Sequence, residues 1–127
     1  MELNQAWRNR GFTVTWSDTH HCDREPDNQY SNADGWTEGW YRFTGDAGTK
    51  LANECVQPFH CGSYANMWLS DPEPAEADGS VDRQVCVSSE PDCCVDTLTV
   101  KVLNCGSHFL YYLPQAPACY ATFCGDN

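Results

Sequence analysis

The six residues from Asp18 to Asp23 carry side chains that could bind a metal ion. Two imidazoles, a thiol and two carboxylates follow one another in this run, and zinc accepts His and Cys ligands. However, the adjacent His20 and His21 would point to opposite faces of an extended segment, and an oxidised Cys22 is no ligand. We therefore interpret both histidines as surface residues and predict no metal site and no cofactor.

Cys105 and His108 could form a nucleophile and its base, because a nearby imidazole lowers the pKa of a thiol. No third group that would orient the imidazole is recognisable, and the pair falls on a predicted hairpin turn. We therefore interpret Cys105 as a structural cysteine and predict that the protein is not an enzyme.

Four acidic residues could bind calcium, which takes six to eight oxygen ligands. They lack the spacing of a calcium loop, and an acidic loop is more often only solvated. Calcium binding remains an alternative. The four residues are Asp71, Glu73, Glu76 and Asp78.

The chain has nine cysteines in 127 residues, a density typical of proteins that are cross-linked by disulfides in an oxidising compartment. The number is odd, so at least one cysteine lacks a partner within the chain, and spacing alone leaves the pairing open. We predict an extracellular or secreted protein. Met1 to Arg10 does not have the pattern of a signal peptide, so we expect the leader to be missing from this sequence.

A net charge of −11 argues against two classes of partner. Nucleic acids and anionic lipid surfaces attract cationic proteins and would repel this chain. No apolar run is long enough to span a bilayer. We predict no nucleic-acid partner and no direct membrane insertion.

Short apolar runs separated by turn residues predict one mostly β, disulfide-rich domain over residues 1–127, with antiparallel sheets and at most a short helix. The clearest strand is Asp96 to Asn104, which alternates apolar and polar residues. His108 to Leu113 is its expected antiparallel partner, since the link Cys105-Gly106-Ser107 has hairpin length. Weaker strands are predicted at Phe12–Trp16, Trp40–Phe43, Val81–Val87 and Tyr120–Phe123.

We expect the short helix around Lys50–Val56. Two polar, turn-rich segments, Asp23–Gly39 and Ser70–Ser80, are expected to be solvated and mobile loops, and we interpret them as the interacting surface.

Several motifs resemble the uromodulin-like cysteine-rich domain, which has eight or ten cysteines. They are Gly39-Trp40-Tyr41-Arg42-Phe43, Met67-Trp68-Leu69 and the vicinal pair Cys93-Cys94, within a resemblance that covers a core from Cys22 to Cys124. Leu3 to Arg8 also resembles the segment before this core in ten-cysteine members.

The resemblance implies four disulfides and leaves Cys105 unpaired in this chain. In the family pattern Cys105 pairs with an upstream cysteine, so we expect this sequence to be truncated at its N-terminus. The implied pairs are Cys22–Cys119, Cys55–Cys93, Cys61–Cys124 and Cys86–Cys94.

The resemblance also implies an extracellular, non-enzymatic module accompanied by EGF-like or zona pellucida domains. Some members carry an N-glycan just after the M-W-L motif, where it acts as a decoy for bacterial adhesins. Here Ser70-Asp71-Pro72 follows the motif and offers no acceptor, so the decoy role does not transfer. The stretch between Cys22 and Gly39 looks like an insertion relative to the family.

The aromatic residues of Gly39–Phe43 and Trp68 could stack on sugars, but their density beside cysteines favours a place in the core. We interpret Arg42 as a structural hydrogen-bond donor. We therefore predict an interaction or scaffold module with an unknown protein or glycan partner, within a larger secreted or membrane-anchored glycoprotein. The alternative is a calcium- or carbohydrate-binding recognition domain.

Overall fold

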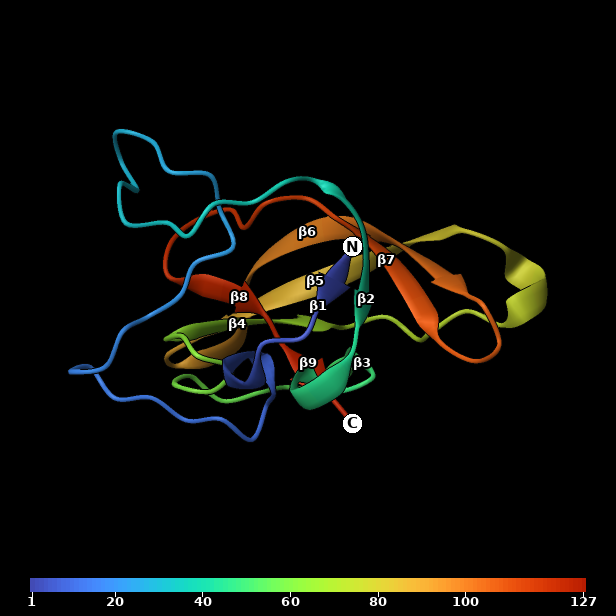
Figure 1. Ribbon diagram of the computed structural model, residues 1–127, viewed down its shortest axis with the longest axis horizontal. Coiled ribbons are helices and arrows are strands. Elements are labelled where there is room, and N and C mark those ends of the chain that lie inside the picture. The colour runs from blue at the N-terminus through green and yellow to red at the C-terminus, as the bar shows by residue number, and fades with distance from the viewer.

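A computed structural model describes all 127 residues. The chain forms nine strands and three short 3-10 helices, and Figure 1 shows their arrangement. Seven strands form one sheet in the order β1-β2-β7-β6-β5-β4-β8, and β3 and β9 form a second, two-stranded sheet. The elements are β1 (Glu2–Leu3), η1 (Ala6–Arg8), β2 (Gly39–Phe43), η2 (Gly45–Ala47), β3 (Lys50–Leu51), β4 (Ala65–Leu69), η3 (Glu76–Asp78), β5 (Val81–Ser89), β6 (Asp92–Asn104), β7 (Phe109–Leu113), β8 (Ala121–Phe123) and β9 (Gly125–Asp126). None of the helices is long and apolar enough to cross a membrane.

The predicted hairpin is confirmed. Strands β6 and β7 pair antiparallel with Asn104 opposite Phe109, and Gly106 in the link has a φ of 85°. The alternation also predicts correctly which side of β6 faces the core. Val100 and Val102 are buried in the main core, while the intervening Lys101 is exposed. The predicted strands at Trp40–Phe43, Val81–Val87 and Tyr120–Phe123 are confirmed as β2, β5 and β8.

The two edges of the large sheet differ from the predicted antiparallel arrangement. β1 pairs parallel with β2, and β8 pairs parallel with β4. Strand β4 was not predicted, because nearly all of its residues are buried and it therefore lacks the alternation of a half-buried strand. Its Met67 and Leu69 lie in the main core, whereas Trp68 packs on a smaller cluster around Cys61 and Cys124.

Two predicted elements are wrong. Phe12–Trp16 makes only an isolated bridge between Thr13 and His60, because its neighbour is a loop and offers no strand edge. Lys50–Val56 is not helical: Lys50 and Leu51 pair with β9, and the N–H of Ala52 donates to the carbonyl oxygen of Cys124. These sheet contacts outweigh a weak local helix preference.

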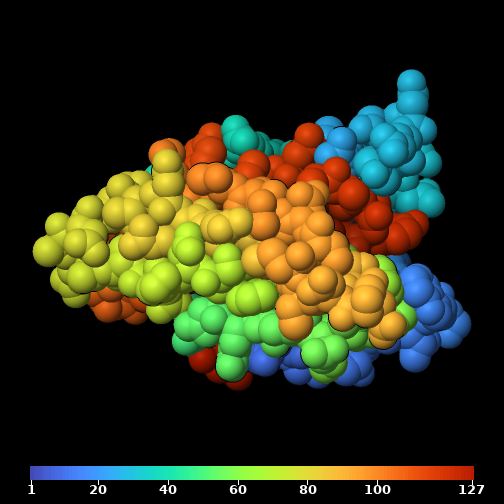
Figure 2. Space-filling view, turned by 180° about the vertical axis from the view of Figure 1, so that it is seen from behind, coloured from blue at the N-terminus to red at the C-terminus, as the bar shows by residue number.

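The two predicted loops lie at opposite ends of the molecule. Figures 1 and 2 both show the segment after Ser70, with η3, at one end of the long axis and the segment after Asp23 at the other. The expectation that Asp23–Gly39 is solvated throughout is wrong, since Asp23 is 2% exposed and Trp36 packs against the main core. Only the middle of this loop projects into solvent.

Candidate functional site

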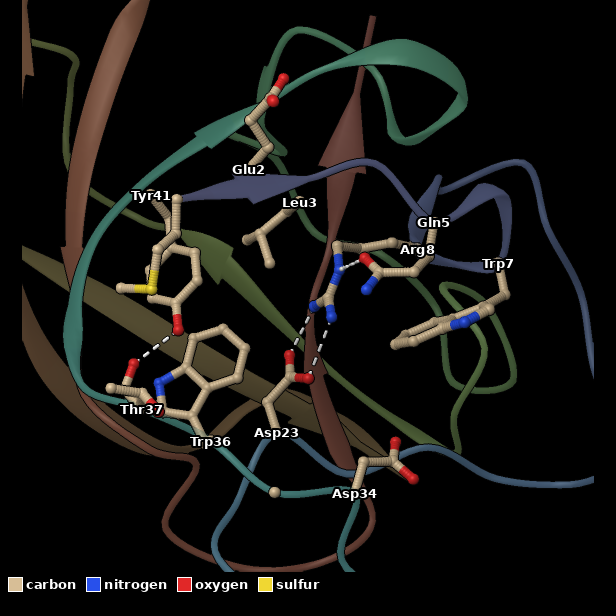
Figure 3. Close-up of a pocket in the computed structure, with 12 residues that line it drawn as sticks. Glu2, Leu3, Gln5, Trp7, Arg8, Asp23, Asp34, Trp36, Thr37 and Tyr41 are labelled. Atoms are coloured by element: carbon tan, nitrogen blue, oxygen red, sulfur yellow. Dashed lines mark hydrogen bonds and ion pairs between the residues drawn. The ribbon is translucent and has the colours of Figure 1, made fainter.

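The first candidate site is a cleft of about 380 Å³ whose floor is a buried ion pair between Arg8 and Asp23 (Figure 3). Arg8 is placed by η1 and Asp23 begins the long loop. The guanidinium approaches the carboxylate in a bidentate manner, with Nη1–Oδ2 at 2.5 Å and Nη2–Oδ1 at 3.1 Å. Both residues are 2% exposed, so the pair joins two segments inside the protein.

Hydrogen bonds to the surroundings complete this ion pair. Arg8 Nη1 also donates to the carbonyl oxygen of Phe123, and the Phe123 N–H donates to Asp23 Oδ2 at 2.8 Å. Arg8 Nε donates to Gln5 Oε1 at 3.2 Å. A buried ion pair is tolerated when its remaining donors and acceptors are satisfied in this way. The charges therefore neutralise each other and leave no free charge on the floor of the cleft.

Aromatic rings form the walls of the cleft. The Arg8 guanidinium carbon lies 4.5 Å from the centre of the Trp7 ring and 5.9 Å from that of Trp36. Trp36 stacks on Tyr41 at 4.6 Å between ring centres. Burial raises the pKa of Tyr41, and the negative charge of Asp23 raises it further. This arrangement fits a structural junction that fixes the base of the loop.

The second candidate site is an aromatic surface around Trp16, which is 70% exposed. We call the cluster of Trp16, His20, Phe59, Tyr64 and Tyr120 the Trp16 surface. The Trp16 ring stacks on Tyr64 at 4.9 Å and meets the edge of Phe59 at 4.8 Å, and His20 stacks on it at 5.5 Å. His20 in turn lies 5.8 Å from the Tyr120 ring. A cavity of about 390 Å³ opens beside these rings.

The two histidines and the cysteine of the run Asp18–Asp23 each have partners within the protein. His20 Nε2 lies 2.9 Å from the carbonyl oxygen of Thr15, and His21 Nδ1 lies 3.0 Å from Asp34 Oδ2. Cys22 is in a disulfide. The structure brings no three His, Cys, Asp or Glu side chains together in a metal-binding arrangement.

The Cys105 thiol and the His108 ring, which the sequence analysis considered as a nucleophile and its base, have no bond to each other. The Cys105 N–H donates to the carbonyl oxygen of His108, but the His108 ring bonds to Ser107 Oγ at 2.8 Å. Cys105 is exposed and free.

Two carboxylates of the acidic loop accept hydrogen bonds from backbone N–H groups. Asp71 Oδ2 accepts the Gln84 N–H, and Asp78 Oδ2 accepts the Ala75 N–H.

The structure contains four disulfides, and they join the same cysteines that the family resemblance implies.

The expectation for the aromatic residues holds in part, because Tyr41 and Phe43 are buried while Trp40 and Trp68 are half-buried. The expectation for Arg42 is wrong. Its side chain is exposed and makes no hydrogen bond with the protein, because it points from β2 to the solvent side; Arg8 is the structural arginine instead.

Sequence reasoning missed the pairing of Arg8 with Asp23, and it missed the Trp16 surface. Arg8 and Asp23 meet only through the tertiary fold, so their spacing gives no signal. For Trp16 the available signal was the number of rings in its neighbourhood, without any indication of which of them would be exposed.

Comparisons with known proteins agree on one family. The family model of the uromodulin-like domain matches residues 41–125. The pancreatic secretory granule membrane major glycoprotein GP2 of Rattus norvegicus is 38% identical over 97 residues, which is 73% of this chain and 18% of that protein. Uromodulin of Rattus norvegicus is 30% identical over 125 residues, which is 98% of this chain and 17% of that protein. Uromodulin of Mus musculus is 31% identical with the same coverage.

Proposed function

This chain belongs to the uromodulin-like domain family, and on that premise we propose that it is a non-enzymatic interaction or scaffold module of a larger extracellular glycoprotein. Two features support the proposal. The names of the relatives include a membrane glycoprotein, and the chain spans only 17–18% of the relatives' length. Four disulfides in a domain of this size suit an oxidising, extracellular compartment.

The observation that carries the proposal is an exposed loop on a fixed base. Asp23 ties the start of the loop to Arg8, and Arg24 Nη1 donates to the carbonyl oxygen of Ala116 at 2.8 Å. At the tip, Asp27 Oδ1 accepts the N–H groups of Gln29 and Tyr30. Figure 2 shows this segment projecting from the body of the molecule. Exposed loops on rigid scaffolds are common binding elements.

The partner is a protein or a glycan outside the cell, and its identity is open. A photo-crosslinking amino acid at Gln29, in the protein as the cell secretes it, tests whether the loop contacts a partner. The matched control carries the same amino acid at Thr99, an exposed position on β6. We expect a discrete cross-linked product from position 29 and none from position 99. Equal products from both positions, or no product from position 29, would contradict the proposal.

A carbohydrate-binding role is the second candidate function, and the exposed ring of Trp16 is the observation that favours it.

A further inference from the structure

The Trp16 ring is exposed but held in one orientation. The ring packs on Phe59 and Tyr64, and backbone bonds tie these segments together. The Val14 N–H donates to the carbonyl oxygen of Phe59, and the Phe59 N–H donates to that of Tyr64. Phe59 has a φ of 70°, a left-handed conformation that is uncommon for a bulky residue and often marks functional sites. Asp18 closes the turn after the ring by accepting the Thr15 N–H at 2.8 Å. The protein therefore presents a preorganised indole to solvent.

The cavity beside Trp16 is lined by polar groups that the protein leaves free. Thr19 and Asn32 are exposed, Tyr120 is half-buried, and their side chains make no hydrogen bond to another residue of the chain. Asp18 and Asp34 each use only Oδ2, so a second carboxylate oxygen remains available on each. Donors and acceptors thus surround one apolar face, as in pockets that orient a small ligand by a few polar contacts.

This combination selects among ligand classes. A metal ion would need several ligating side chains close together, and the carboxylates and imidazole of this cavity are not grouped in that way. An anion would meet Asp18 and Asp34 in a protein of net charge −11. A pyranose ring offers C–H groups that can pack on the indole and hydroxyls that both donate and accept. A neutral sugar is therefore the class that best matches an exposed indole beside both donors and acceptors.

We propose that the Trp16 surface and its cavity bind a neutral, hexose-containing glycan. The ring of Trp16 packs against one face of a hexose, while Asn32, Asp18 and Asp34 bond to its hydroxyls. This inference deepens the proposed role in recognition and rests on it.

Fluorine NMR of the protein labelled with 5-fluorotryptophan tests this site directly, since the chain has five tryptophans and the Trp16→Phe variant identifies one resonance. The probes are neutral oligosaccharides ending in mannose, glucose or galactose, and sialylated or sulfated counterparts. We expect at least one neutral series to shift the Trp16 resonance saturably. Its acidic counterparts should bind at least about tenfold more weakly.

Variants separate the site from the rest of the surface. Trp16→Ala lacks the reporter resonance, so isothermal titration calorimetry follows its binding, which should be weaker by more than about tenfold. Asn32→Ala should weaken binding by a smaller factor. Phe12→Ala is the control, because Phe12 is a 43% exposed ring on the same segment and does not line this cavity. It should bind as the parent does. The unchanged resonances of the other tryptophans report that each variant is folded.

Three results would overturn the inference: no saturable shift with any neutral probe, equal binding of acidic probes, or saturation by an arginine-rich peptide with no effect of sugars. None of them affects cross-linking from Gln29, so failure of the glycan site is distinguishable from failure of the proposed module function.

Discussion

Replacing Asp23 by Asn should destabilise the protein by about 3–5 kcal/mol, because the Arg8 guanidinium would be left buried without a counter-charge. The Asn side chain keeps nearly the same shape, and its oxygen can still accept the Phe123 N–H. Its NH2 group would then face Arg8 Nη2, so the loss combines the charge with one hydrogen bond. Unfolding entropy of about 2 cal/mol/K per residue gives roughly 0.27 kcal/mol/K for this chain. The melting temperature should therefore fall by roughly 10–20 °C.

Differential scanning calorimetry with the disulfides intact measures this loss. The matched control is Asp82→Asn, which removes a carboxylate from the exposed ion pair with Lys101 and should cost less than about 1 kcal/mol. A loss of under about 1 kcal/mol for Asp23→Asn, or equal losses for both variants, would refute the assigned role of the buried pair.

Two further predictions concern cross-links and pH. Replacing both cysteines of the 97-residue Cys22–Cys119 link should lower the free energy of unfolding by about 4.7 kcal/mol, and replacing those of the 8-residue Cys86–Cys94 link by about 2.5 kcal/mol. Denaturant unfolding measures both losses, and equal losses would contradict the prediction. Burial raises the pKa of Tyr111 above its ordinary value of 10.0, so its contribution to stability is complete below pH 10 and is lost as the pH rises further. The chain has six tyrosines, and an alkaline titration of absorbance should show at least one of them ionising only with unfolding. Ionisation of all six in the folded protein would contradict the burial of Tyr111.

The sequence predicts the parts of the fold that depend on local information. The β6–β7 hairpin follows from alternation around a short link with Gly106, and neither requires knowledge of distant segments. Strand β4 could not be recognised, because burial of both faces removes the alternation. The false helix at Lys50–Val56 has the opposite cause: its hydrogen-bond partners lie in the C-terminal segment, far along the chain.

The candidate sites were less predictable than the fold. Arg42, within a recognised motif, turned out to be solvent-exposed, whereas Arg8 pairs with Asp23 through contacts that only the folded chain creates. The exposure of Trp16 likewise depends on the loop that places Phe59 against it. Tertiary placement, not residue type, decides which charged and aromatic groups form a site.

Recognition through the loop and the Trp16 surface depends on a frame that disulfides lock in place. Peptide mapping of the secreted protein under non-reducing conditions, after labelling with iodoacetamide, tests this frame most directly. Within this chain, every cysteine other than an exposed Cys105 should be found in a cross-linked peptide. The expected pairs are Cys22–Cys119, Cys55–Cys93, Cys61–Cys124 and Cys86–Cys94. Any other pairing among these eight, or label on any of them in the folded protein, would contradict the account.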